Sequence, residues 1–293
     1  MSEREPFQRY LDRMAAAGFR PSSTLGQNFL LDPSLHRWIA ECAAPTPADT
    51  VVEIGAGLGF LTRELVARAG RVIAVEIDPR LLALAREDLV GATNLEWIAG
   101  DALGGPGGTL SPTIGAMLAR PLPAGGRRLL IANLPYAVSG PLLAEVVAAD
   151  PPFDAAVLLV QKELAQRVVA APGAEDHGGL SVGVQVMFVG KLLRDVPPQV
   201  FRPRPKVTSS ILHLVRRPDA PPELAQAAAR RSFLAFVRAL FQQRRKVLRT
   251  TLPAAAAAIG RTAPVLDDAE LGGRAEQASV ASIVGWWRSC TPP

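Results

Sequence analysis

Residues of the kinds that build metal centres and disulfide frameworks are scarce in this sequence. Its 293 residues include two cysteines and three histidines. Cys42 and Cys290 stand near opposite ends of the chain without paired spacing, which predicts neither a disulfide framework nor a zinc site. His36, His177 and His213 are isolated from one another and from any acidic cluster. We therefore expect no metal site.

Long hydrophobic runs are also missing. No apolar stretch approaches the ~20 residues that span a bilayer, so no membrane association is expected. The chain opens on Glu3, Arg4 and Glu5 rather than on a basic segment followed by an apolar one, which argues against a secretory signal. With 48% hydrophobic and 20% charged residues, the composition is that of a globular protein. We expect a cytoplasmic protein of two domains, since one core rarely grows to this length.

Positive charge is concentrated near the end of the chain. Residues 218–293 hold ten Arg or Lys and six Asp or Glu, which accounts for +4 of the net charge of +5. The segment from Arg230 to Arg249 carries seven basic side chains and no acidic one, with apolar residues recurring at helical spacing between them. Such a segment suits a polyanion, although a solvated basic helix face gives the same pattern.

Short apolar runs alternate with helical segments from Thr50 onward. This alternation predicts βαβ units and a parallel sheet. We predict a Rossmann-like α/β sheet of seven strands, the last antiparallel, in a catalytic domain at 1–217, and a small helical RNA-binding domain at 218–293. A Gly- and Pro-rich insertion with one short helix is expected at 102–127. The strands are expected at 51–54, 71–77, 95–101, 129–132, 155–160, 183–193 and 209–215.

A glycine-rich turn, residues 53–59, follows the first of these strands and opens a helix. Its glycines let the backbone pass close to a ligand. Glu76 ends the next strand, where a carboxylate can accept both hydroxyl protons of a ribose, and Asp101 ends the strand after it, where it can accept from an exocyclic amine. The spacing G-x-G-x-G, with Phe60 in place of the third glycine of a dinucleotide fingerprint, favours S-adenosyl-L-methionine (SAM) over NAD.

The tetrapeptide Asn133-Leu134-Pro135-Tyr136 follows the fourth strand. An exocyclic adenine amine is a poor nucleophile, because its lone pair is delocalised into the ring. The Asn133 side-chain oxygen and a backbone carbonyl of Leu134 or Pro135 can accept its hydrogens and turn the lone pair toward a methyl sulfonium. Pro135 favours an extended Leu134, and Tyr136 offers a ring on which the base can stack. The tetrapeptide predicts methyl transfer to adenine N6.

The sequence resembles the ribosomal RNA adenine dimethyltransferase family (KsgA type) from about Leu25 to about Leu252. The resemblance implies a class I SAM-dependent methyltransferase that dimethylates N6 of two adjacent adenosines near the 3′ end of small-subunit (16S) rRNA during ribosome biogenesis. The motifs that carry it are LGQNFL at 25–30, EIGAGLG at 53–59, Glu76, GD at 100–101, NLPY at 133–136, QKE at 161–163, LSV at 180–182, FRPRPKVTSS at 201–210 and FQQRRKVLR at 241–249.

The resemblance also assigns site residues. It implies that Phe201 stacks on the target adenine opposite Tyr136, and that a monomer acts on 16S rRNA in an assembling 30S particle. From the residues alone, Phe201 passes as core and Asn28 as part of a polar turn. The SAM contacts that it implies are Asn28, Leu30, Gly55, Glu76, Asp101 and Asn133.

Three alternatives stay open at this point. Related enzymes that methylate an adenine of large-subunit RNA share most motifs, but they usually have Ile in place of Leu134, and the segment 241–249 favours the small-subunit branch. A non-catalytic RNA-binding assembly or transcription factor would keep the fold without turnover. An NAD-dependent oxidoreductase would need a hydride-transfer site, for which no residue is evident.

Two departures from the family pattern, His177-Gly178-Gly179 and the long segment 104–127, leave the details of RNA contact open.

Overall fold

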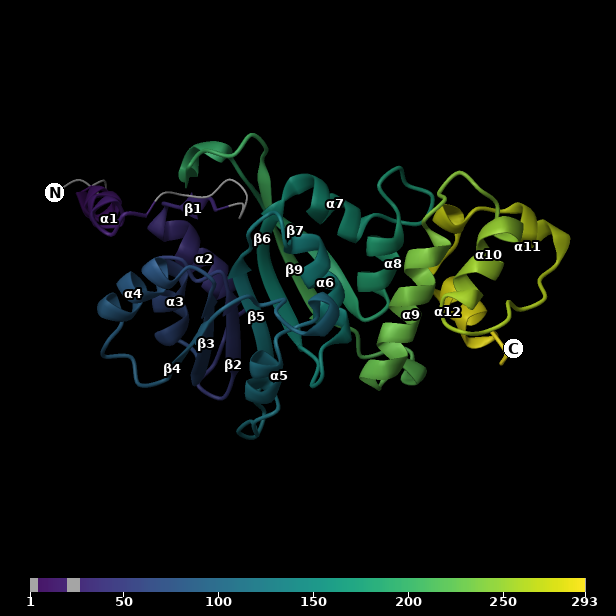
Figure 1. The fold of residues 1–293 in the computed structure, drawn as a ribbon, viewed down its shortest axis with the longest axis horizontal. Helices are drawn as coiled ribbons and strands as arrows, with labels where there is room; N and C mark the ends of the chain where they lie inside the picture. Colours follow the sequence, from purple (N-terminus) through teal and green to yellow (C-terminus); the bar gives the residue numbers. More distant parts are fainter. Residues whose placement is uncertain (1–4, 20–26, 293) are drawn as a thin grey trace. The chain divides into compact units, whose positions relative to one another are not determined.

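The computed structural model describes residues 5–19 and 27–292 of the chain. Helices and strands alternate from β1 to α7, and the elements after β9 are helical (Figure 1). In chain order the elements are α1 (Glu5–Ala16), β1 (Phe29–Leu30), α2 (Pro33–Cys42), β2 (Thr50–Ile54), α3 (Phe60–Val66), β3 (Arg71–Glu76), α4 (Pro79–Asp88), β4 (Leu95–Ala99), η1 (Pro106–Gly108), α5 (Pro112–Leu118), β5 (Arg128–Asn133), α6 (Ser139–Ala148), β6 (Ala155–Gln161), α7 (Lys162–Val169), α8 (Gly179–Gln185), β7 (Phe188–Val196), η2 (Pro198–Val200), β8 (Phe201–Arg202), β9 (Ser209–Arg216), η3 (Pro222–Leu224), α9 (Ala227–Leu240), α10 (Leu248–Ala257), α11 (Asp268–Gly272), η4 (Ala275–Gln277) and α12 (Val280–Arg288).

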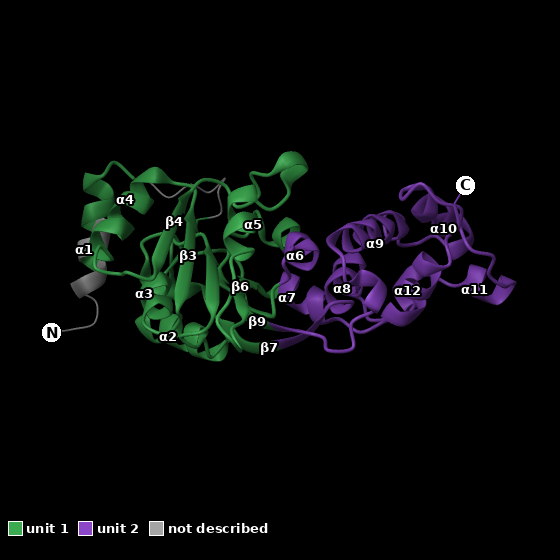
Figure 2. Ribbon diagram, turned by 90° about the horizontal axis from the view of Figure 1, so that it is seen from below, with its two compact units in different colours: residues 1–142, 153–162, 192–213 green, residues 143–152, 163–191, 214–293 purple. Residues whose placement is uncertain are grey.

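Contacts between residues group the chain into two compact units, coloured green and purple in Figure 2. Two segments that precede residue 217 belong to the second unit, and the predicted domain limit between 217 and 218 stays a prediction. The first unit consists of residues 1–142, 153–162 and 192–213, and the second of residues 143–152, 163–191 and 214–293.

A seven-stranded sheet, in the order β4-β3-β2-β5-β6-β9-β7, confirms the predicted fold class. β2 pairs in parallel with both β3 and β5, and the pairs β3–β4 and β5–β6 are parallel as well. The chain winds outward from β2 through β3 to β4 and then returns to the other side of β2 with β5. This reversal is a topological switch point, where ligands of open α/β sheets bind beyond the carboxyl ends of the strands.

Buried apolar residues form the central strands. Every residue of β2 is buried, and so is every residue of β6 except the last. Parallel strands of this kind are covered on both faces and therefore consist of nearly continuous apolar runs. Ile39 of α2 and Leu65 of α3 are fully buried in one hydrophobic cluster with Val51 of β2. These contacts hold the strands whose ends carry the predicted site.

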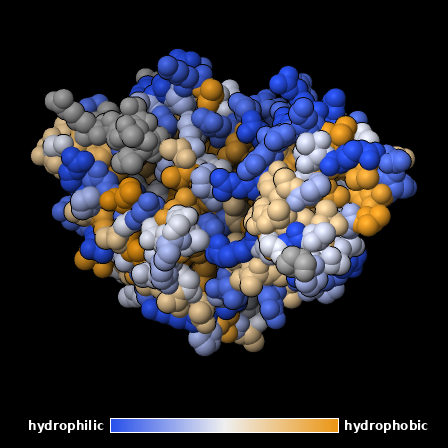
Figure 3. Space-filling view, turned by 45° about the vertical axis from the view of Figure 1, so that its right-hand side comes forward, coloured by the Kyte–Doolittle hydropathy of each residue, from blue (hydrophilic) through white to orange (hydrophobic). Residues whose placement is uncertain are grey.

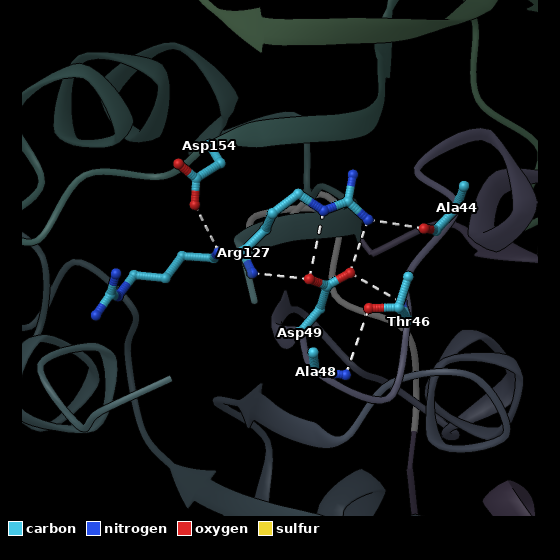
Figure 4. Close-up of polar contacts among 7 residues, drawn as sticks. Ala44, Thr46, Ala48, Asp49, Arg127 and Asp154 are labelled. Carbon is cyan, nitrogen blue, oxygen red and sulfur yellow. Dashed lines mark hydrogen bonds and ion pairs between the residues drawn. The ribbon is translucent and has the colours of Figure 1, made fainter. Parts of the chain in front are cut away.

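A polar cluster ties β2 to β5 at their amino ends, away from the predicted site (Figure 4). The carboxylate of Asp49 is completely buried and accepts hydrogen bonds from the backbone N–H of Arg127 at 2.7 Å and of Thr46 at 2.8 Å. The Arg127 guanidinium donates to the same carboxylate at 2.7 Å and to the Ala44 carbonyl at 2.7 Å. A buried carboxylate with this many donors is compensated for its lost hydration.

The strand predicted at 183–193 is wrong in its first half. Residues 179–185 form α8, and β7 begins at Phe188. The Ser181 hydroxyl donates to the Arg167 carbonyl at 2.6 Å and accepts from the Gly178 N–H at 3.0 Å, which fixes the first turn of α8. An apolar run of this length does not by itself distinguish a buried strand from a buried helix. The expected short helix of the insertion is present as α5.

Helices α9 to α12 lie in the second unit. The buried residues of α9 include Phe233, Phe236, Val237 and Leu240, which recur at helical spacing and confirm the apolar face expected in this segment. On the face of the molecule drawn in Figure 3, hydrophobic residues form scattered groups among hydrophilic ones. None of the helices in the described ranges has both the length and the apolar character needed to cross a membrane.

Candidate active site

A cavity in the first unit collects all six predicted cofactor contacts. They come from the segment before α2, from the turn after β2, and from the ends of β3, β4 and β5. The six are Asn28, Leu30, Gly55, Glu76, Asp101 and Asn133, and each lines the cavity. In the described part of the chain, no three His, Cys, Asp or Glu side chains gather so that they could hold a metal ion.

The turn after β2 needs its glycines. Gly55, Gly57 and Gly59 have φ angles of 77°, 57° and 76°, in the left-handed region that side-chain-bearing residues avoid. A Cβ on Gly55 would also lie 3.2 Å from Cδ of Pro135, a tight contact between the two predicted motifs. The motifs at 53–59 and 133–136 therefore meet in one wall of the cavity.

Glu76 is held in place by backbone groups. Its carboxylate accepts the N–H of Gly57 at 2.7 Å and the N–H of Asp78 at 2.9 Å, and the residue is 4% exposed. Burial raises the pKa of Glu76, although these hydrogen bonds oppose the shift. Asp101, by contrast, is exposed two residues beyond β4, and its carboxylate accepts the Leu103 N–H at 2.9 Å. The cavity thus offers one fixed buried carboxyl group and one exposed carboxylate.

Hydrogen bonds around residues 133–139 distinguish the possible acceptors for a base. The Asn133 side-chain amide donates to the Asn28 carbonyl at 3.4 Å, so its oxygen is the end left for a ligand. The Pro135 carbonyl already accepts the Val138 N–H at 3.2 Å and the Ser139 hydroxyl at 3.0 Å. The Leu134 carbonyl receives no hydrogen bond from the residues that the structure describes.

The structure does not bring every predicted catalytic residue to the cavity wall. Asn133 and Pro135 line it, whereas Leu134, Tyr136 and Phe201 do not. Tyr136 is half-buried, and its hydroxyl lies 2.6 Å from that of Ser209. Phe201 pairs with Leu30 across the short β1–β8 ladder and is fully buried in the hydrophobic cluster. Stacking of Phe201 on a base would require this segment to open, and that role stays a prediction.

Two titratable groups in the cavity wall, Glu53 and His36, were not predicted as site residues from the sequence. Glu53 is 2% exposed and its carboxyl group accepts the Thr62 hydroxyl at 2.6 Å. Burial raises the pKa of Glu53 to about 8, and the neighbouring Glu76 adds to the shift. His36 is 7% exposed, its Nε2 lies 3.2 Å from the Leu30 carbonyl, and its Nδ1 has no partner among the described residues. Burial lowers the pKa of His36 to about 4.

Comparisons with known proteins identify the family. The model of a family described as ribosomal RNA adenine dimethylase matches residues 18–284. The chain belongs to this family. It is 43% identical over 256 residues to the ribosomal RNA small subunit methyltransferase A of Pelotomaculum thermopropionicum, an alignment that covers 85% of this chain and 83% of that one.

Solved structures agree with the fold of this adenine dimethylase. A dimethyladenosine transferase from Plasmodium falciparum has a TM-score of 0.65 and 23% identity, over 86% of this chain and 94% of that one. The 23S rRNA methyltransferase ErmE has a TM-score of 0.60 and 27% identity, over 89% and 98%. Family membership confirms the predicted enzyme class, a SAM-dependent methyltransferase on a Rossmann-like sheet.

Proposed function

We propose that this protein dimethylates N6 of two adjacent adenosines near the 3′ end of small-subunit (16S) rRNA, as a cytoplasmic monomer acting on an assembling 30S particle. The observation that carries the proposal is the position of Asn133 and Pro135, which line the same cavity as Glu76 and Asp101. The small-subunit methyltransferase of P. thermopropionicum, similar over most of both chains, favours small-subunit over large-subunit rRNA as the target.

The cavity fits an adenosine-containing cofactor. Glu76 is positioned to accept the two ribose hydroxyls, because backbone N–H groups already fix its carboxyl group and little reorganisation is needed on binding. Asp101, exposed beyond β4, is placed to accept from the adenine amine. Asn28, Leu30 and Gly55 line the remainder of the cavity. When bound, SAM supplies a methyl group on a positively charged sulfonium.

For the target adenine, the hydrogen bonds within the protein favour two acceptors. The Asn133 side-chain oxygen can accept one N6 hydrogen, since the amide nitrogen of the same group is tied to the Asn28 carbonyl. The Leu134 carbonyl can accept the other, because that of Pro135 already has two donors. Both bonds turn the amine lone pair out of the ring plane and toward the methyl group. Alignment of this kind can lower a barrier by roughly 7–11 kcal/mol.

Two methyl transfers follow from the same geometry. After the first transfer the proton on the charged amine passes to water, and one N–H remains. Asn133 or the Leu134 carbonyl can accept this hydrogen and orient the lone pair again. After the second transfer no N–H is left, so the reaction stops at dimethyladenosine.

We assign rRNA binding to those Arg and Lys side chains of the segment 230–249 that have no partner within the described residues. Arg230 is 1% exposed and binds backbone carbonyls, so it is not part of an RNA surface. Arg238, Arg245 and Lys246 are exposed, and their side chains form no hydrogen bond or ion pair within the described residues. These three side chains are available to phosphates.

The test is the nucleoside product of isolated ribosomal particles. Wild-type protein with SAM should produce dimethyladenosine in 30S particles that lack the modification, measured by mass spectrometry of digested rRNA. Asn133→Ala should slow both methylation steps by ~10²-fold or more, as removal of an oriented hydrogen-bonding group does in other enzymes. A product that stops at monomethyladenosine, a product in 23S rRNA alone, or a normal rate for Asn133→Ala would refute the proposal.

A further inference from the structure

Two neighbouring serines at the start of β9 have different partners. Ser209 and Ser210 are both completely buried. The hydroxyl groups of Ser209 and Tyr136 share a hydrogen bond of 2.6 Å. The Ser210 hydroxyl donates to Asp195 at 2.5 Å, and Asp195 also accepts from Lys162 at 2.6 Å. The two side chains point to opposite faces because successive residues of a strand alternate.

The hydrogen bond with Ser209 orients Tyr136, a residue that lies outside the helices and strands. Tyr136 lies in the irregular turn between β5 and α6, which follows the cavity-lining Pro135. Burial raises the pKa of the Tyr136 phenol, so the group keeps its proton at neutral pH. The direction of the ring therefore depends on packing and on the one hydrogen bond at its far end. That bond comes from a strand more than seventy residues away in the chain.

Each hydroxyl of this pair satisfies the other. The structure gives Ser209 no second side-chain partner among the described residues, and the same is true of the Tyr136 hydroxyl. Loss of the Tyr136 hydroxyl leaves the completely buried Ser209 hydroxyl without a side-chain partner, which costs more than the bond itself gains. The two groups therefore form a unit that holds one geometry.

We propose that Ser209 is a positioning residue for the methylation reaction, which holds the Tyr136 ring in the orientation that stacks on the target adenine. The proposal rests on the proposed function, in which Tyr136 is the stacking surface for the base. Ser209 does not line the cavity, and it acts through Tyr136 alone. It extends the target-base site from residues 133–136 to the first residue of β9.

A double-mutant cycle tests the proposal. Ser209→Ala, Tyr136→Phe and the double variant are compared with wild type for kcat/KM toward unmodified 30S particles, and for SAM affinity by calorimetry. Tyr136→Phe keeps the ring and removes only the hydroxyl. Each single change should lower kcat/KM about three- to tenfold, the range expected for one buried hydrogen bond. The double variant should be no worse than either single variant, because both remove the same interaction. SAM affinity should stay within about twofold, since neither residue lines the cavity.

Ser210→Ala is the matched control. This change removes an equally buried hydroxyl one residue away, but its partner is Asp195 rather than Tyr136. The variant should keep kcat/KM within about twofold of wild type. Ser209→Thr retains a hydroxyl and should restore most of the activity that Ser209→Ala loses. A merely structural role for Ser209 would give neither the rescue nor the non-additive cycle.

Three results would overturn the inference: normal kcat/KM for Ser209→Ala, losses that multiply in the double variant, or an equal loss in Ser210→Ala. If Ser209→Ala fails to fold, normal kcat/KM for Tyr136→Phe alone would overturn it. Tyr136→Ala separates this inference from the proposed function. If removal of the whole ring leaves methylation normal, the stacking role itself is wrong, whereas a large loss with a normal Ser209→Ala rejects only the role of Ser209.

Discussion

Glu53 is a carboxyl group whose protonation should control the stability of the protein. It lies at the carboxyl end of β2 and lines the cavity, with a side chain that is 2% exposed. Burial raises its pKa from 4.5 to about 8; the hydrogen bond from Thr62 opposes the shift, and the neighbouring Glu76 adds to it. At neutral pH the folded protein therefore keeps Glu53 protonated, whereas the unfolded chain releases the proton.

The sign and size of the effect follow from this difference. Because the folded-state pKa is the higher one, the contribution of Glu53 to stability is complete below pH 4.5 and is lost as the pH rises toward 8. One pKa unit corresponds to 1.36 kcal/mol. Because the folded protein keeps the proton of Glu53 at pH 7 and the unfolded chain releases it, the unfolding free energy at pH 7 is lower by about 3 kcal/mol than below pH 4.5. Glu53→Gln removes this titration. Its unfolding free energy relative to wild type should rise by about 1.4 kcal/mol per pH unit from pH 5 to 7.

Urea denaturation at pH 5, 6 and 7 measures this slope. The two amide hydrogens of the new glutamine add an offset that does not change with pH, so the slope is the decisive quantity. Glu163→Gln serves as the control, because its side chain is 75% exposed and the effect expected for Glu53 comes from burial. A difference between Glu53→Gln and wild type that stays constant over this pH range would show that Glu53 is ionised in the folded protein and that burial does not raise its pKa.

Three further predictions concern the cofactor, the fold and the RNA. Glu76→Ala should raise the SAM Kd about tenfold or more in calorimetry, because hydrogen bonds to a charged acceptor contribute ~1.5–3 kcal/mol; unchanged affinity would remove Glu76 from the cofactor site. Asp49→Asn should lower the unfolding free energy by about 2 kcal/mol at pH 7, less than for a fully buried pair because Arg127 is 39% exposed. Burial acts to raise the pKa of Asp49, but hydrogen bonds, chiefly from Arg127, hold it below its usual value, so this loss should shrink below about pH 4 in denaturation curves. Replacing Arg245 and Lys246 by Glu should weaken 30S binding and flatten its salt dependence while SAM affinity stays constant, and unaltered binding would leave both as solvated surface residues.

Sequence spacing predicted the cofactor side of the site because strand order alone brings those residues together. Gly55, Glu76 and Asn133 each stand at or just after the carboxyl end of a parallel strand, and β3, β2 and β5 are neighbours in the sheet. Parallel strands place these ends at one edge, so residues far apart in the chain converge without any knowledge of side-chain packing. Their placement around one cavity follows from the sheet topology. Their roles in binding and catalysis stay predictions, and the experiments above test those of Glu76 and Asn133.

Other site residues depend on tertiary contacts that spacing does not encode. His36 is an isolated histidine in the sequence, and only the packing of α2 against the cavity reveals its unpartnered Nδ1. Ser209 gives no signal of its own, since its partner Tyr136 lies in a different motif. Glu53 carried one available signal, an acidic residue at the end of an otherwise apolar strand. Such a residue is buried by its position, and burial is what raises its pKa.

In the basic segment 230–249, the charge pattern alone overestimates the number of side chains available to RNA. Seven cations without an acidic neighbour in the sequence suggested one RNA-binding face. Four of these side chains, however, form hydrogen bonds or ion pairs within the protein. Arg230 donates to the Ala149, Leu224 and Ala225 carbonyls, and thereby satisfies backbone acceptors in the interior of the second unit. The side chains of the other three have acidic partners, Arg231 with Glu145, Arg244 with Glu276, and Arg249 with Asp268.

Three cations of this segment, Arg238, Arg245 and Lys246, then remain for phosphates. Each neutralised phosphate contributes about −0.7 to −0.9 to the slope of log K against log salt, so this segment accounts for a slope of about −2 to −3 rather than the −5 to −6 that seven cations would give. A steeper measured slope for 30S binding would mean that basic residues elsewhere, such as Arg204 and Lys206 in the exposed turn before β9, share the contact. The change in slope between wild type and the double Glu variant thus measures how much of the salt dependence Arg245 and Lys246 contribute.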